Sequence, residues 1–270
     1  MEAPSIKSIG VIGVGNMGKA LLSGFAKTQN NLALFASTRT PSTITPLIPL
    51  GVTPVDSIQA LAHKSDLLLV CVKPKDIETV LAELAPALSP KTILLSIAAG
   101  IPLERLERLG CPAIRCMPNT PALVGQGVFA FAFGKGVDAA MQQTILDLFS
   151  PLGLSLSLPE AQFPAFSALL GAGPALVVTM MQGMVLAGIK MGFSQRLSRD
   201  LIDALFLGTA AWSKAQPETH LIALRDMVTS PKGLTIDGVQ ALEAKGFAGT
   251  TMEAVLACYE KAIAMEHTKK

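Results

Sequence analysis

The chain has 270 residues, enough for one large domain or two modest ones, and half of these residues are hydrophobic. Its formal charge of +2 is too small to indicate nucleic acid or an anionic membrane as a partner. Only 16% of the residues are charged, so we expect a second subunit to cover part of the surface. The four cysteines show neither a Cys-x-x-Cys pair nor metal-ligand spacing, which predicts reduced thiols and no metal in a cytoplasmic protein. The start, Met-Glu-Ala-Pro-Ser, lacks the basic and apolar segments of a signal peptide.

A glycine-rich motif between a predicted strand and a predicted helix is the first functional signal. Residues 6–12 form an apolar run, Gly13-Val-Gly-Asn-Met-Gly18 follows, and an amphipathic helical pattern comes next. In a dinucleotide-binding fingerprint, Gly13 permits a tight turn, Gly15 lets the backbone approach a pyrophosphate, and Gly18 lets helix and strand pack closely. A glycine turn in an α/β protein without nucleotide is the alternative. The strand-turn-helix context favours the dinucleotide.

The end of the second predicted strand, residues 31–36, indicates which dinucleotide binds. An NAD site usually places Asp or Glu there for the ribose hydroxyls, whereas an NADP site places a cation for the 2′-phosphate. No acidic residue lies between Lys19 and Val55, and Arg39 follows Ser37 and Thr38. A guanidinium flanked by hydroxyls suits a bidentate phosphate contact, with a solvated surface arginine as the alternative. The pattern favours NADP(H).

The alternation of strands and helices continues and predicts a doubly wound, mostly parallel sheet. We expect strands at residues 67–72, 92–97, 113–117, 127–133 and 154–158, and helices at residues 76–87 and 137–149. Several of these strands end in Pro, Gly or small polar residues, which allow the backbone to come close to a ligand. Doubly wound sheets bind ligands at the carboxyl ends of their strands. The predicted fold class is therefore α/β, with an N-terminal Rossmann domain over residues 1–158.

The second half shows only helical patterns, at residues 174–191, 194–215, 235–244 and 250–264. Residues 161–189 carry no charge and exceed the ~20 residues that a membrane span needs. Their prolines and glycines, and the absence of flanking basic clusters, favour a buried helix over a membrane span. Because a small domain hides a limited fraction of its surface, we expect residues 159–270 to form an all-α dimerisation domain of a homodimer.

The sequence lacks the acid–base groups of many reductases. His63, His220 and His267 lie in polar or terminal segments, and neither a Ser-His-Asp arrangement nor an HExxH motif is present. A reductase without a general acid suits a substrate that already carries its proton, such as a protonated imine. The site then needs only to position a ring, bind any carboxylate and exclude water.

Five blocks of the sequence resemble the pyrroline-5-carboxylate reductase family. They are Gly13-Val-Gly-Asn-Met-Gly18, Val72-Lys-Pro74, Ser96-Ile-Ala-Ala-Gly100, Arg115-Cys-Met-Pro-Asn-Thr-Pro121 and Val228-Thr-Ser-Pro-Lys-Gly-Leu-Thr235. The resemblance runs from residue 9 to about residue 245, in the family's order. It implies reduction of L-1-pyrroline-5-carboxylate to L-proline, the last step of proline synthesis, with NADPH and with NADH as a second candidate. It also implies a Rossmann domain followed by a helical dimerisation domain, with dimers that often assemble into a decamer, a pentamer of dimers.

The same resemblance implies roles for individual residues. Cofactor contacts are expected from Ile12, Gly13, Val14, Gly15, Asn16, Met17, Ser37, Thr38, Arg39, Asp56, Val72, Lys73, Pro74, Ala98, Ala99, Gly100 and Asn119. Substrate contacts are expected from Glu160, contributed by the partner subunit, and from Val228, Ser230, Gly233, Leu234 and Thr235. Thr235 is expected to begin a helix whose first N–H groups hold the substrate carboxylate. The Thr235 hydroxyl is expected to hydrogen-bond the ring nitrogen, so Thr235 is the expected catalytic residue.

The chain departs from the family's pattern at several positions. The family usually has Ser-Gly-Ser-Gly-Pro-Ala-Tyr where this chain has Leu170-Gly-Ala-Gly-Pro-Ala-Leu176, and Met227 replaces a polar residue. Asp56 stands where asparagine is common. In the late block Lys232 replaces a glycine, which predicts either local strain, if φ is positive, or an added charge near the carboxylate.

Two other functions remain open at this point. A 3-hydroxyacid dehydrogenase would use a lysine from the long helix after the sheet, but residues 176–188 contain none. A non-catalytic NADP-binding relative is the second alternative, motivated by the departures from the family's pattern.

Overall fold

The computed structural model describes residues 6–29 and 31–267. The chain divides into two compact units, one formed by Met1–Gly171 with Tyr259–Lys270 and the other by Ala172–Cys258. Residues 159–171 and the end of the chain therefore group with the first unit, which also holds all the strands.

The first unit is built on an eight-stranded sheet with the order β3-β2-β1-β4-β5-β6-β7-β8. Its strands are β1 (Ser8–Ile12), β2 (Ala33–Ser37), β3 (Val52–Pro54), β4 (Leu67–Val70), β5 (Ile93–Ser96), β6 (Ala113–Pro118), β7 (Gly127–Phe133) and β8 (Gly153–Ser157). Every neighbouring pair is parallel except β6 and β7. The predicted doubly wound, mostly parallel sheet is confirmed, and the chain reverses its winding direction between β1 and β4.

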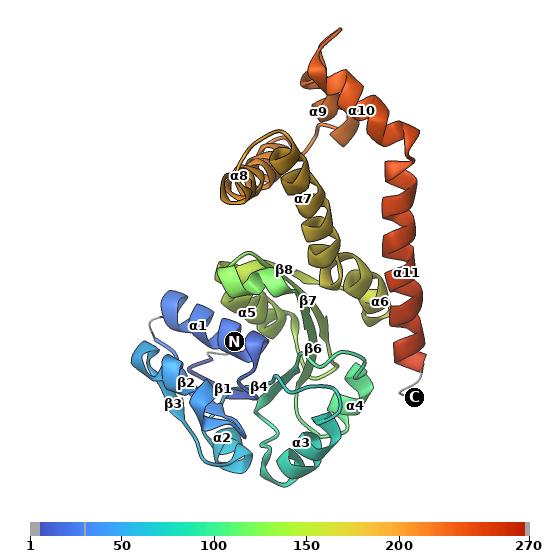
Figure 1. Cartoon of the computed structure of the whole chain (residues 1–270). Coiled ribbons are helices and arrows are strands. Elements are labelled where there is room, and N and C mark those ends of the chain that lie inside the picture. The colour runs from blue at the N-terminus through green and yellow to red at the C-terminus, as the bar shows by residue number, and fades with distance from the viewer. Residues whose placement is uncertain (1–5, 30, 268–270) are drawn as a thin grey trace. The chain divides into compact units, whose positions relative to one another are not determined.

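Helices cover both faces of this sheet (Figure 1). One face packs against α1 (Asn16–Thr28) and α5 (Ala139–Phe149), and the other against α2 (Ile58–His63), α3 (Ile77–Leu84) and α4 (Leu103–Glu107). Leu67 and Leu69 belong to the first core, whereas Leu68 and Val70 belong to the second. A parallel strand buried on both faces reads as such a continuous apolar run, because alternate side chains enter different cores.

The structure contains several short elements that the sequence patterns did not predict. β3, α2, α4 and the later helix α9 (Leu221–Met227) were not predicted, and none exceeds seven residues. Too few turns repeat in such segments for a periodic pattern to be visible. β4 also ends two residues before the predicted end, at Val70, and Cys71 and Val72 leave the sheet.

The second unit contains α7 (Gly173–Lys190), α8 (Gln195–Lys214), α9 and α10 (Leu234–Ala244), and α11 (Phe247–His267) begins in it. The long predicted helices are confirmed, with Ser194 as the N-cap of α8. Before α7 come α6 (Phe163–Phe166) and a π-helical turn, Ser167–Gly171. The Leu170–Leu176 segment that departs from the family's pattern therefore spans a π-turn and the start of α7.

Much of the apolar surface in the second unit is uncovered within one chain. The segment Glu160–Lys190 is long and apolar enough to cross a membrane, yet only 6% of its most apolar stretch is buried. Val178, Leu186 and Met191 are more than half exposed. Apolar surface of this extent marks an interaction site, either with a membrane or with another protein chain.

Candidate functional site

A pocket of about 690 Å³ lies at the carboxyl ends of β1, β2 and β4, where the winding of the sheet reverses. Of the residues expected to contact a cofactor, those that line it are Ile12, Gly13, Val14, Gly15, Ser37, Thr38, Arg39, Asp56, Val72 and Lys73. These residues come from four separate stretches of sequence. The sheet topology brings them together, because parallel strands end at one edge.

The glycine turn after β1 has the geometry of a phosphate cradle. Gly13 adopts φ +89°, and its N–H donates to the Ser37 carbonyl oxygen at 2.9 Å. A Cβ on Gly15 would meet no atom within 4 Å, so the space above this residue is open. Among the described residues no side chain caps α1, whose first turn contains no acid. Exposed N–H groups at a helix start bind anions, so this turn suits a pyrophosphate.

Arg39 stands at the rim of the pocket and is 83% exposed. Its Nη2 donates to Oδ2 of Asp76 at 3.0 Å, which leaves other N–H groups of the guanidinium directed to solvent. Ser37, Thr38, Thr40 and Thr43 supply hydroxyls to the same part of the lining. Sequence reasoning missed Asp76, because only the fold brings the residue preceding α3 beside the end of β2.

Other predicted cofactor residues lie outside this lining. Asn16 is exposed at the start of α1, and Met17 packs against the core beneath it. Pro74, Ala98, Ala99 and Gly100 follow β4 and β5 along the same edge of the sheet. Asn119 follows β6, where its Oδ1 accepts a hydrogen bond from the Val128 N–H at 2.8 Å. Its side-chain oxygen thus holds β7 against β6.

Cys71 also lines the pocket, but its thiol is unreactive. Burial raises the pKa of the Cys71 thiol to about 12. The thiol is therefore protonated at neutral pH and is not a nucleophile. All four cysteines are free, as the sequence predicts.

The late polar turn, residues 228–233, joins α9 to α10 in the second unit. The Gly233 N–H donates to the Ser230 carbonyl oxygen at 3.0 Å, which closes the turn. Leu234, rather than the expected Thr235, is the first residue of α10, and Gly233 is its N-cap. Ser230 and Thr235 are exposed, and their hydroxyls find no hydrogen-bond partner among the described residues. The turn therefore presents two free hydroxyls and an uncapped helix start to a ligand.

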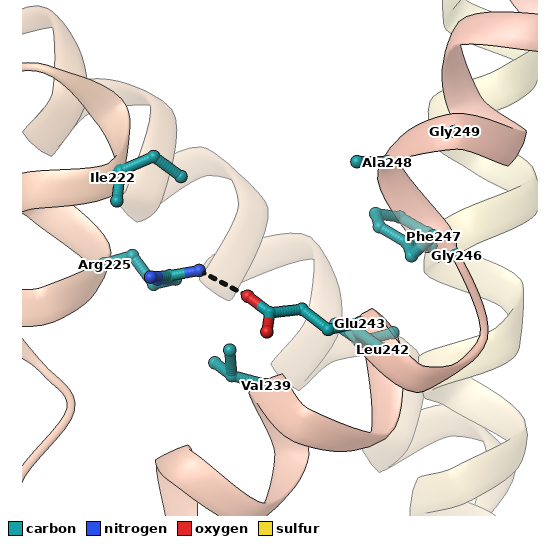
Figure 2. A pocket seen from close by; sticks show the side chains of 9 residues that line it. All are labelled: Ile222, Arg225, Val239, Leu242, Glu243, Gly246, Phe247, Ala248 and Gly249. Carbon is teal, nitrogen blue, oxygen red and sulfur yellow. Dashed lines mark hydrogen bonds and ion pairs between the residues drawn. The ribbon is translucent and has the colours of Figure 1, made fainter.

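Figure 2 shows the hollow that separates α9 from α10 and the start of α11. It measures about 350 Å³ and is lined mainly by apolar side chains, including Ile222, Leu242 and Phe247. Arg225 Nη1 crosses to Oε1 of Glu243 at 2.9 Å. The Arg225 backbone carbonyl also accepts the hydroxyl of Thr229 at 2.8 Å. The first bond links α9 to α10, and the second ties the beginning of the turn to α9.

Lys232 keeps the backbone conformation that a glycine would adopt. Of the non-glycine residues that the structure describes, it is the one with a positive φ, 59°. An L-residue with a side chain pays roughly 1–2 kcal/mol for this region. The strain that the sequence predicts for a positive φ is thus present at Lys232.

We predict that Lys232→Gly raises the free energy of unfolding by roughly 1 kcal/mol, because glycine has no Cβ to strain in this region. Denaturant unfolding at one fixed protein concentration measures the change, since assembly alters apparent stability. Lys245→Gly is the matched control, because Lys245 ends α10 with φ −96° and gains nothing from glycine. Equal effects of the two substitutions would contradict the prediction.

Glu160, an expected substrate contact, lies in the first unit directly after β8. Its Oε1 accepts a hydrogen bond from Arg115 Nη1 at 2.7 Å, and the Arg115 side chain is only 3% exposed. Arg115 belongs to one of the sequence blocks that resemble the family, but the resemblance implies no role for it. A charged residue inside a predicted buried strand was the available signal, since buried charges require partners.

Both halves of the chain match the models of known protein families. Residues 160–265 match a family model described as pyrroline-5-carboxylate reductase dimerisation, and residues 8–100 match one described as NADP oxidoreductase coenzyme F420-dependent. The pyrroline-5-carboxylate reductase of Pseudomonas aeruginosa is 35% identical over 264 residues, covering 95% of this chain and 96% of the relative. That of Aquifex aeolicus is 33% identical over 257 residues, covering 94% and 96%.

A solved structure shows the same similarity in three dimensions. The Plasmodium falciparum pyrroline carboxylate reductase with NADP bound superimposes with a TM-score of 0.82 at 30% identity. The alignment covers 96% of this chain and 98% of that one. The similarity therefore extends over both units.

Proposed function

Because the chain belongs to the pyrroline-5-carboxylate reductase family, we infer that it reduces L-1-pyrroline-5-carboxylate to L-proline with NADPH. The observation that carries this inference is identity of about one third over nearly the whole chain, combined with an open phosphate cradle at the turn of β1. Family membership also argues against the 3-hydroxyacid dehydrogenase alternative.

The pocket fits the adenosine and pyrophosphate half of NADP(H). The open space above Gly15 and the uncapped start of α1 would receive the pyrophosphate, and Arg39 with its neighbouring hydroxyls would hold the 2′-phosphate. Ala98, Ala99, Gly100 and Asn119, further along the sheet edge, are proposed for the nicotinamide side. NADH, which lacks the 2′-phosphate, would forgo the Arg39 contact and is the weaker candidate.

NADPH, when bound, supplies a hydride to the carbon of the protonated C=N bond. The product nitrogen keeps the hydrogen that the imine already carried, so the chain need not supply a general acid. We propose that the first N–H groups of α10 hold the substrate carboxylate and that the Thr235 hydroxyl bonds the ring nitrogen. Val228, Ser230, Gly233 and Leu234 would shape the rest of this substrate site.

The exposed apolar faces of the second unit fit a homodimer. The match to a dimerisation model covers residues 160–265, including the whole segment that could otherwise cross a membrane, Glu160–Lys190. We propose that a second copy of the chain buries these faces in a soluble, cytoplasmic enzyme, and that dimers assemble further, with a decamer as the candidate form.

The activity is tested by following the loss of NADPH absorbance with L-1-pyrroline-5-carboxylate and detecting L-proline as the product. We expect steady turnover. If a purified, folded oligomer binds NADPH but produces no proline, the non-catalytic alternative is correct.

Arg39→Ala tests the cofactor preference. Because a charged hydrogen bond to phosphate is lost, we expect KM for NADPH to rise about 10- to 100-fold while KM for NADH changes little. Arg108→Ala is the control, since Arg108 is also exposed and paired with an acid, Glu104, away from the pocket. An equal effect on both cofactors would contradict the 2′-phosphate assignment.

A further inference from the structure

A buried guanidinium connects three distant parts of the first unit. Arg115 lies on β6, 4.7 Å from the ring centroid of Phe163. Its Nη1 donates to Glu160, and its Nη2 donates to Oε1 of Glu266, near the end of α11, at 2.8 Å. Both carboxylates are about one third exposed, whereas the arginine is buried. A buried cation needs such partners, so the orientation of Glu160 is set by Arg115.

Glu160 makes a second contact that reaches toward the expected cofactor site. Its Oε1 also accepts a hydrogen bond from the backbone N–H of Leu103 at 2.7 Å. Leu103 is the first residue of α4, and its N-cap, Pro102, provides no side-chain acceptor. The Glu160 carboxylate therefore satisfies an N–H group that this helix start would otherwise leave unpaired.

The Leu103 N–H lies at the end of the loop that follows β5. This loop, residues 97–102, contains Gly100 with φ +70°. At its beginning the Ala98 N–H donates to Oγ of Ser96 at 3.2 Å. The Ile97 N–H donates to the Val70 carbonyl oxygen at 3.1 Å, and at the loop's end the Leu103 N–H bonds the Glu160 carboxylate, 57 residues further along the chain. Glu160 thus restrains a loop that we propose to border the nicotinamide.

We propose that Glu160, oriented by Arg115, is a positioning residue that holds this loop in place for hydride transfer, rather than a contact of the substrate. The proposal rests on the proposed function and on the proposed place of Ala98–Gly100 beside the nicotinamide. Its basis is that Oε1 already accepts two hydrogen bonds of 2.7 Å from its own chain. Loss of the carboxylate would free the loop without altering the pocket for the adenosine phosphates.

The test compares Glu160→Ala, Glu160→Gln and Glu266→Gln in the full-length oligomer. Glutamine at position 160 keeps a carbonyl acceptor for the Leu103 N–H, whereas alanine does not. Glu266→Gln weakens the other ion pair of Arg115 and leaves the Leu103 contact untouched. The measurements are kcat, KM for L-1-pyrroline-5-carboxylate, the Kd of NADPH from its fluorescence, and amide hydrogen exchange over residues 98–108.

For Glu160→Ala we expect kcat to fall about tenfold and exchange at the start of α4 to rise at least tenfold. Both KM for the substrate and Kd for NADPH should stay within about twofold of the wild type. Glu160→Gln should recover kcat to within about threefold, and Glu266→Gln should match the wild type. Should Glu160→Ala fail to fold, Glu160→Asp, whose carboxylate is one methylene short of Leu103, replaces it in the comparison.

Three results would overturn the proposal. A raised KM for the substrate with unchanged hydrogen exchange would make Glu160 a substrate contact. An equal loss of kcat in Glu266→Gln would reduce the cluster to a general stabiliser. Unchanged exchange and unchanged kcat in Glu160→Ala would remove any positioning role. Absence of turnover in the wild type would instead overturn the proposed function, and the exchange data would still test whether Glu160 holds the loop.

Discussion

Thr235→Ala is expected to lower kcat about 100-fold while leaving the melting temperature unchanged. The side chain is exposed and makes no hydrogen bond within the described residues, so its removal costs the fold little. In the proposed mechanism the ring nitrogen changes from a protonated imine to an amine during hydride transfer. Because the nitrogen gains a lone pair in this step, a hydroxyl that donates to it is bonded more strongly in the transition state than in the ground state, and loss of one such donor typically costs about 10²–10³ in rate.

The measurement is steady-state kinetics with NADPH saturating, supported by the Kd of NADPH, which should not change. Thr235→Ser provides the control, because serine keeps the hydroxyl and loses only a methyl group. We expect it to retain most of the wild-type kcat. If alanine at this position turned over substrate as fast as threonine, the assignment of the late turn as the substrate site would be wrong.

Substitutions in the glycine turn are expected to separate cofactor binding from folding. Gly15 has φ −80°, which alanine adopts freely, and an added Cβ would meet no protein atom within 4 Å. We therefore expect Gly15→Ala to fold with an unchanged melting temperature. The added methyl would occupy the space proposed for the pyrophosphate, so the Kd of NADPH should rise at least roughly tenfold.

Gly18→Ala is the matched comparison within the same motif. A Cβ on Gly18 would overlap the carbonyl oxygen of Gly13, a backbone atom that cannot rotate away. We expect this variant to lose about 1–3 kcal/mol of stability, as overpacked sites do, in addition to NADPH affinity. Thermal unfolding and NADPH fluorescence measure the two effects. Wild-type affinity in a folded Gly15→Ala protein would contradict a phosphate cradle at this turn.

The long elements of the fold were predictable because their residues carry strong local patterns. The four residues of β4 are apolar on both faces, and α8 combines an amphipathic pattern with Ser194 at its N-cap. The nucleotide-binding turn was equally visible, since Gly13, Gly15 and Gly18 each meet a distinct steric need. Local propensity and hydrophobic period agree in these segments, and such agreement makes a sequence readable.

Contacts between residues far apart in the chain were decided only by the tertiary structure. Arg39 meets Asp76 because β2 and the segment before α3 lie at one edge of the sheet. Arg115 meets Glu160 and Glu266, which are 45 and 151 residues away, and Glu160 closes the start of α4. In the sequence, Glu160 is recognised only as matching a glutamate of the family. Its hydrogen-bond partners in the structure are what indicate a positioning role.

The sequence by itself thus determined the fold class, the nucleotide turn and the family, because these depend on local spacing and residue type. The tertiary structure decided the antiparallel pairing of β7 with β6, the left-handed backbone at Lys232 and the partners of the buried Arg115. Strand direction and long-range ion pairs depend on how distant segments meet in space. A local sequence pattern does not predict such contacts, because the burial and packing that determine which residues pair depend on the folded structure.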